Sequence, residues 1–399
     1  MTMAISDLGT FAVGLLALLL TGAVVTRLPA LARTNIPVPV IAGVSVALMV
    51  GLLHHFGGVS IQFSSQLTNF LLLVFFTTIG LSAKFSALRA GGRPLLILCV
   101  VTVVLLVLQN IVGIAIASAF GAHPYYGLLV GSVSFVGGPG TAAAWAKEAQ
   151  AAGLQHAPEV AVGAATLAVV VGAIVSGPVT DWLIRRKKLR GPAGEATANW
   201  VAPGATTPAA APPIATIMLV LLLIVGAVIA GDAANQWARG AGLTLPGFLT
   251  AMLAGVAITN LGDAFGAKLD LAPVERGGEI ALQAFLVMYL MSLKLWTLSA
   301  AFTPLLVNVA VQVLVTVLVG TVILFRWLGR DYDAAVTVGG FLGFVLSSMP
   351  VAMATMDSVA SRHGPSPKAF LLIALAGSFF VDLANAFVIK AFLSLPWLH

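Results

Sequence analysis

The chain has 399 residues, of which 59% are hydrophobic and 9% are charged, whereas an average soluble domain carries about 25% charged residues. This composition excludes a water-soluble globular protein, because apolar runs of about 20 residues, long enough to cross a bilayer, recur from Leu8 to Pro396. The single cysteine, Cys99, excludes an internal disulfide and a metal cluster built from cysteines.

Apolar runs separated by Gly, Pro and charged residues predict ten membrane crossings in two sets of five. Residues 1–7 lack the basic start and small-residue cleavage site of a removed signal peptide, so the first run is expected to remain as a helix. The first set lies at about 8–26, 38–56, 66–83, 94–120 and 159–184, and the second at about 214–231, 245–261, 279–296, 303–326 and 368–396.

Between the fourth and fifth runs of each set lies an apolar stretch that is interrupted near its middle by Gly, Pro or Ser. These stretches span about 124–153 and 332–363. Two half-length helices that meet at such a tip leave non-helical backbone at membrane depth, which is tolerated only where protein or a polar cavity satisfies it. We therefore expect two re-entrant hairpins.

The basic residues orient the crossings, because Lys and Arg accumulate in short cytoplasmic loops. With the N-terminus outside, 16 of the 20 Lys and Arg residues fall on the cytoplasmic side. The run from Arg185 to Arg190 is then a topology signal at a helix end, so the net charge of +6 gives no reason to expect a nucleic-acid partner. Both termini are predicted to lie outside, and residues 191–213, rich in Ala, Pro and Thr, to form a mobile cytoplasmic linker.

The two parts of the chain that this linker separates, 1–190 and 214–399, share motifs at a nearly constant spacing. Ser134-Phe-Val matches Gly343-Phe-Val at an offset of 209, and Tyr125 matches Tyr332 at an offset of 207. Because each part holds an odd number of crossings, the second must lie inverted relative to the first. The predicted fold is an all-α polytopic membrane protein made of two inverted repeats of five transmembrane helices, each with a re-entrant hairpin, as in many secondary transporters.

An ionisable group inside the membrane marks a functional site by default, because its burial is costly. Most of the 14 Asp and Glu residues lie in loops or at the ends of runs, but Asp382 is near the middle of the last run. Asn385 follows three residues later, so both side chains project from the same helix face. Two hard oxygen ligands on one face predict a site for a cation such as sodium. The alternative is a structural hydrogen-bonded pair of Asp and Asn.

The tips of the two hairpins are the second candidate site. The first tip carries Gly137, Gly138, Gly140 and Thr141, and the second carries Ser347, Ser348 and Pro350. Glycines allow close backbone approach, and the second limb, expected to begin at Thr141, offers free amide groups that attract an anion such as a carboxylate. A Gly-Gly-Pro-Gly run is often only a turn. Its place in an apolar stretch, and its counterpart in the other half, favour a substrate site.

Five motifs together resemble the bacterial sodium/glutamate symporter family over nearly the whole chain. They begin at Phe75 (Phe-Phe-Thr-Thr-Ile-Gly-Leu-Ser), Ser134 (Ser-Phe-Val-Gly-Gly-Pro-Gly-Thr), Leu293 (Leu-Lys-Leu-Trp), Tyr332 (Tyr-Asp-Ala-Ala-Val) and Phe379 (Phe-Phe-Val-Asp-Leu-Ala-Asn). The resemblance implies sodium-coupled uptake of L-glutamate by alternating access, with sodium as coupling ion and no other cofactor. It also implies a homodimer in the bacterial cytoplasmic (inner) membrane, with the outer termini in the periplasm.

The chain departs from the family pattern at both tips. Pro139 stands where the family commonly has histidine, and Val345, Ser347 and Met349 replace residues of a more glycine-rich second tip. Altered tips could alter selectivity, so a sodium- or proton-coupled carrier of another small carboxylate, such as a hydroxycarboxylate, stays open. Arg362 is the one arginine near enough to the second hairpin to favour a di- or tricarboxylate. An intramembrane enzyme is the other alternative, but the sequence lacks the clustered acids, histidines or metal motif that it would need.

Overall fold

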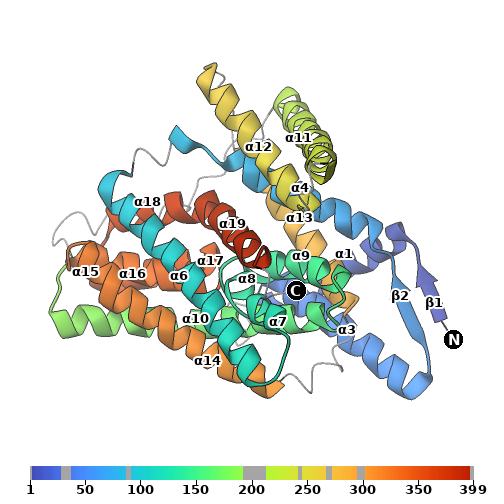
Figure 1. Cartoon of the computed structure of the whole chain (residues 1–399), viewed down its shortest axis with the longest axis horizontal. Coiled ribbons are helices and arrows are strands. Elements are labelled where there is room, and N and C mark those ends of the chain that lie inside the picture. The colour runs from blue at the N-terminus through green and yellow to red at the C-terminus, as the bar shows by residue number, and fades with distance from the viewer. Residues whose placement is uncertain are drawn as a thin grey trace. The chain divides into compact units, whose positions relative to one another are not determined.

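The computed structural model describes residues 2–27, 37–86, 91–191, 213–240, 245–266, 272–293 and 302–395, which form a largely helical protein (Figure 1). Residues 192–212 of the predicted linker, and most of the Leu293-Lys-Leu-Trp motif, lie outside these ranges.

Seven helices within the described ranges are long and apolar enough to cross a membrane. They are α1 (Asp7–Arg27), α3 (Val38–Gly57), α6 (Gly92–Ala119), α10 (Ala157–Lys187), α11 (Ile214–Gly240), α12 (Gly247–Ala264) and the continuous run of α14 (Phe302–Leu318), η3 (Val319–Leu324) and α15 (Phe325–Trp327). Each overlaps a predicted crossing, but the predicted end of α11, residue 231, was wrong, since the helix continues to Gly240. The prediction of a helical, polytopic membrane protein is thus confirmed.

The other three predicted crossings also correspond to helices. They are α4 (Gln66–Ser82), α13 (Ala272–Met291) and the last helix, which consists of α18 (Pro367–Leu375), η4 (Ala376–Phe380) and α19 (Val381–Leu393). The predicted bounds of α13, 279–296, were wrong by several residues at its start. Its first two turns carry Glu275, Arg276 and Glu279, and these charges hid that part of the helix from a hydropathy criterion.

A small parallel pair of strands is a departure from the all-α prediction. β1 (Thr2–Ile5) pairs with β2 (Ser60–Phe63), from Thr2 opposite Ser60 to Ile5 opposite Phe63 (Figure 1). Strands of four residues carry too little alternation to be read from a sequence, and their pairing depends on the distant loop that follows α3.

The described chain divides into two compact units. The first comprises residues 1–85, 146–159 and 211–299, and the second comprises residues 86–145, 160–210 and 300–399. The first unit therefore holds the first three helices of each half and the end of α9, and the second holds the fourth helix and most or all of the hairpin and fifth helix of each half. This division is what a duplicated fold would give if equivalent elements of the two repeats pack together.

The helix contacts inside the first unit are symmetric between the two halves of the chain. Helix α4 packs with α13, and the other contacts form four pairs of counterparts. These are α4 with α12 and α3 with α13, α1 with α3 and α11 with α12, α1 with α13 and α4 with α11, and α1 with α4 and α11 with α13. Exchanging α1 with α11, α3 with α12 and α4 with α13 converts this set of contacts into itself. This is the set of contacts that an internal duplication would produce, and the duplication itself stays a prediction.

Helices α4 and α12 approach each other through glycines, as membrane helices commonly do. A Cβ atom added at Gly80 would lie 2.0 Å from the carbonyl oxygen of Met252, and one at Gly255 would lie 2.8 Å from that of Thr77. The Thr259 hydroxyl donates to the Leu81 carbonyl at 2.7 Å beside this crossing. The backbones are therefore too close for any side chain at Gly80.

We expect Gly80→Val to destabilise the first unit strongly, because the added methyl groups can fit only if two helix backbones separate. Overpacking of this kind costs about 3 kcal/mol or more, so the melting temperature of the purified protein should fall by at least about 5 °C. Gly226→Val in α11 is the matched control, since a Cβ atom there meets nothing within 4 Å. Equal melting temperatures for the two variants would contradict this packing.

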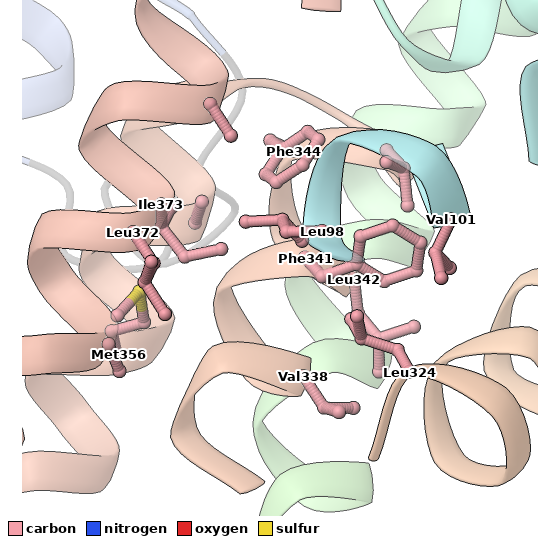
Figure 2. Close-up of a cluster of buried hydrophobic side chains, with 14 of the residues drawn as sticks. Leu98, Val101, Leu324, Val338, Phe341, Leu342, Phe344, Met356, Leu372 and Ile373 are labelled. Atoms are coloured by element: carbon pink, nitrogen blue, oxygen red, sulfur yellow. The ribbon is translucent and has the colours of Figure 1, made fainter. Parts of the chain in front are cut away.

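In the second unit, α16 (Tyr332–Leu346) lies at the centre of the apolar core (Figure 2). Its residues Val338, Phe341, Leu342 and Phe344 pack with side chains of neighbouring elements. Those neighbours include Leu98 and Val101 of α6, Leu324 of η3, Met356 of α17 (Met349–His363), and Leu372 and Ile373 of α18. A helix that is apolar and buried on all sides belongs to the interior of a protein. The core thus holds the first limb of the second predicted hairpin in place.

Candidate substrate and cation site

The second hairpin consists of α16 and α17, which meet at Ser347 and Ser348. These two residues have extended φ values of −154° and −168°, and the Ser348 amide donates to the Gly343 carbonyl at 3.2 Å. A Cβ atom at Gly343 would lie 2.4 Å from the Cα atom of Ala352, so the limbs touch through their backbones directly below the tip. Neither limb, at 15 residues each, is long enough to cross a membrane alone.

The base of this hairpin is tied to α10 and to the start of α18 by polar contacts. Asp181 of α10 accepts a hydrogen bond from Arg362 and, at 3.1 Å, pairs with His363. The Ser366 hydroxyl donates to Asp333 at 2.6 Å. Arg362 is therefore paired at the base of the hairpin and lies a full helix away from the tip. Arg362 therefore gives no reason to expect a di- or tricarboxylate substrate.

The first hairpin is less regular. Its first limb is broken into α7 (Pro124–Leu129) and α8 (Ser132–Phe135), and its second limb is α9 (Gly138–Ala151). The second limb was predicted to begin at Thr141, which was wrong by one turn. The helix begins at Gly138, and Pro139 fits its first turn because proline needs no amide partner there.

The structure brings the two tips together in the second unit. A Cβ atom at Gly138 would lie 3.2 Å from the carbonyl oxygen of Ser347, and one at Gly172 of α10 would lie 3.0 Å from the Ser347 Cβ atom. Gly138 has φ +64°, a left-handed conformation that residues with a Cβ atom rarely adopt. The tips therefore lie close together, with little room for a side chain at Gly138.

Burial differs among the predicted tip residues. Gly138, Gly140, Thr141 and Ser347 are buried, Gly137 and Ser348 are half-buried, and Pro350 is exposed. Helices α9 and α17 both start at these adjacent tips, and the Ser348 side chain does not cap α17. Amide groups at two helix starts provide partial positive charge, which suits a ligand with carboxylate groups.

Asp382 and Asn385 follow η4, a π-helical turn within the last helix. Such turns are frequent at functional sites. The Asn385 side chain is fully buried and donates to the carbonyl of Ser132 in α8 at 3.1 Å, so it contacts the first hairpin. Among the described residues Asp382 is half-buried and takes part in neither an ion pair nor a hydrogen bond.

Two polar oxygens beside Asn385 are left without hydrogen bonds by the described residues. They are the Oδ1 atom of Asn385 itself and the Oγ atom of Ser132, whose amide donates to Asn110 of α6 at 3.0 Å. Buried oxygens that lack donors are suitable ligands for a cation. Ser132 was not among the residues predicted from the sequence, because a lone serine in an apolar stretch carries no signal of its own.

A second group of buried polar residues was also missed. They are Asn308, Gln312 and Thr316 of α14 and Gln109 of α6, all four fully buried, and Gln312 and Thr316 contact Gln109. A signal was available, since three polar residues at four-residue spacing form one stripe along an otherwise apolar helix.

Comparison with known proteins identifies the family. The sequence model described as "Sodium/glutamate symporter" matches residues 3–365, which is most of the chain. The chain belongs to the sodium/glutamate symporter family. This is a family of transporters, so the chain is a carrier, and the alternative interpretation as an intramembrane enzyme was wrong.

Three relatives named "Sodium/glutamate symporter" agree with this assignment. The proteins of Haemophilus influenzae, Escherichia coli (strain K12) and Shigella flexneri are each 37% identical to the chain. The similarity covers 98% of this chain and 98% of each relative. Asp382 and Asn385 lie beyond the end of the family match at residue 365, but these longer alignments extend over almost the entire chain.

Proposed function

We propose that the chain carries L-glutamate into the cell together with sodium ions by alternating access. Family membership supports the class of transport, and the names of the relatives support the two solutes. The observation that indicates where the substrate binds is the contact between the two hairpin tips, at Gly138 and Ser347, within the second unit. Broken elements that meet at a repeat interface hold substrate and ions in many secondary transporters.

The substrate site that we propose is formed by both tips, with the glycines providing backbone amides and the serines providing hydroxyl groups. Its members are Gly137, Gly138, Gly140, Thr141, Ser347, Ser348 and Pro350. L-Glutamate has two carboxylates, and the chain offers two helix starts, α9 and α17, at adjacent positions. One carboxylate at each helix start would explain why the hairpins occur as a pair.

The coupling ion in this proposal is sodium, and Asp382 and Asn385 are its ligands. Asp382 supplies a carboxylate that the described protein leaves unpaired, and Asn385 supplies the amide oxygen that remains free while its nitrogen bonds to the first hairpin. Sodium at this place would hold the last helix to the limb that leads to the first tip. Ion and substrate would then favour the same arrangement of the hairpins, so that each raises the affinity for the other.

The orientation in the membrane is a further part of the proposal. Both termini are periplasmic, the protein lies in the bacterial inner membrane as a homodimer, and the linker, residues 191–213, is cytoplasmic. A cysteine introduced at Ala205 tests this, since the one native cysteine, Cys99, is buried. An impermeant maleimide should leave Ala205→Cys unlabelled in intact cells and label it after the cells are opened. Labelling in intact cells would reverse the predicted topology.

The choice of substrate is tested by uptake into proteoliposomes that contain the purified chain. Labelled L-glutamate should accumulate, and unlabelled L-glutamate should compete at least about tenfold better than citrate, malate or D-glutamate; a tenfold ratio corresponds to about 1.4 kcal/mol of discrimination. Better competition by a hydroxycarboxylate would show that Pro139 and the altered second tip have changed the cargo. If none of these solutes competes, L-glutamate is excluded as the substrate, while the family assignment is unaffected.

A further inference from the structure

Helices α6 and α14 meet in the second unit through amide side chains whose orientations are fixed. Asn308 donates to the carbonyl of Val130, at the break in the first limb of the first hairpin. Gln312 donates to the Gln109 main-chain carbonyl at 2.7 Å, and Gln109 donates to the Val345 carbonyl at 3.3 Å, two residues before the second tip. A carbonyl can only accept, so in each of the three amides the nitrogen must face its partner and the oxygen must point away.

The three amide oxygens that remain have no donor among the described residues. These are the Oε1 atoms of Gln109 and Gln312 and the Oδ1 atom of Asn308, and all three side chains are fully buried. Buried polar atoms are almost always paired in native proteins, so three unpaired amide oxygens on two neighbouring helices require an explanation.

These oxygens belong to side chains that lie beside one another. Gln312 reaches across to Gln109 on α6, and the Gln109 amide in turn lies 3.4 Å from the Thr316 hydroxyl on α14. Asn308 is one helical turn before Gln312 on the same stripe, a rise of about 6 Å. The group therefore places several neutral oxygen ligands on one stripe of α14 and on the neighbouring Gln109 of α6.

We propose that Gln109, Asn308, Gln312 and Thr316 form a second sodium-binding site, separate from the one proposed at Asp382 and Asn385. Hard monovalent cations accept carbonyl and hydroxyl oxygens, and carbonyl oxygens alone can replace the hydration shell of such an ion. The group contains no carboxylate, so it suits a monovalent cation better than Ca²⁺ or Mg²⁺.

The position of this site gives it a role in transport. Its amides are hydrogen-bonded to Val130 and Val345, so an ion held by the same amides would stabilise both hairpins in one arrangement. This inference deepens the proposed sodium-coupled function, since it concerns how many sodium ions accompany one substrate molecule. It can nevertheless be measured without transport.

Binding of ²²Na⁺ to the purified chain, without glutamate, tests the proposal. We expect Asn308→Leu and Gln312→Leu each to weaken one class of sodium binding at least tenfold or to remove one ion per chain. Thr316→Val, which keeps the shape and removes the hydroxyl, should weaken it about threefold and serves if the leucine variants do not fold. Excess Ca²⁺ should not displace the ion from this site.

Asn235→Leu is the matched control. Asn235 of α11, in the first unit, is also a buried amide that donates to a carbonyl, that of Leu245 at 2.9 Å, and that has an unpaired Oδ1 atom. This variant loses equivalent interactions outside the proposed site, so its sodium binding should stay within twofold of the wild type. Equal sodium binding by the wild type, folded Gln312→Leu and folded Thr316→Val would overturn the inference.

The inference and the proposed function can fail separately. If a sodium gradient drives glutamate uptake but the variants bind sodium normally, the amide site is wrong and the function stands. If sodium does not drive uptake but binding is lost in Asn308→Leu and kept in Asn235→Leu, the function is wrong and the site stands.

Discussion

Replacement of Gly138 by leucine is expected to abolish transport while leaving the protein folded and inserted in the membrane. Gly138 has φ +64°, and a Cβ atom there would lie 3.2 Å from the Ser347 carbonyl oxygen. A leucine must therefore distort the start of α9 and push the second tip away. Because a displacement of about 1 Å at a reacting or binding group can cost about 100-fold in rate, we expect uptake of L-glutamate to fall at least about 100-fold.

Gly121→Leu is the matched control for this variant. Gly121 also has a left-handed conformation, with φ +71°, but a Cβ atom there meets nothing within 4 Å. Both substitutions impose the same kind of backbone strain, of about 1–2 kcal/mol, but only one disturbs the contact between the tips. Uptake by Gly121→Leu should stay within about threefold of the wild type. Wild-type uptake by Gly138→Leu would exclude the tip from the transport site.

The second large effect is expected for Asp382→Asn, which removes the charge with little change in shape. If the carboxylate binds sodium, the concentration of sodium that gives half-maximal uptake should rise at least tenfold. Linkage also requires that the affinity for L-glutamate at a fixed, subsaturating sodium concentration fall. Titration of uptake with sodium, and of glutamate binding at several sodium concentrations, measures both effects.

Asp232→Asn controls for the loss of one acidic side chain. Asp232 is exposed on α11 and accepts a hydrogen bond from Gln236 at 2.8 Å. Its replacement should change the sodium response less than about twofold. An unchanged sodium response in Asp382→Asn would make Asp382 structural, and the coupling ion would then have to bind among the tip carbonyls and hydroxyls or at the amides of α6 and α14.

The helices could be predicted from the sequence because most of them are long apolar runs bounded by charges, Gly or Pro. The positions of α1, α3, α4 and α6 agree with the predicted runs to within about two residues. The start of α13 could not be predicted in this way, because its first turns carry charged residues and so do not belong to an apolar run. Strands β1 and β2 depend on pairing between distant segments.

The candidate site could be predicted only in part. The tips stand out because Gly and Ser interrupt apolar stretches, and Asp382 stands out because it is an acid in an apolar helix. The contact between Gly138 and Ser347, and the bond from Asn385 to Ser132, are products of tertiary packing that no spacing in the sequence encodes. Arg362 shows the converse, since closeness in sequence to the second hairpin suggested a substrate contact and the fold pairs it with Asp181.

The central claim is that sodium binding drives the uptake of L-glutamate, and a gradient experiment on proteoliposomes with the purified chain tests it most directly. With an inward sodium gradient and no gradient of protons, labelled L-glutamate should accumulate inside to above its external concentration, and collapse of the sodium gradient should release it. Equal accumulation after sodium is replaced by potassium, or accumulation that follows an imposed proton gradient alone, would contradict the claim.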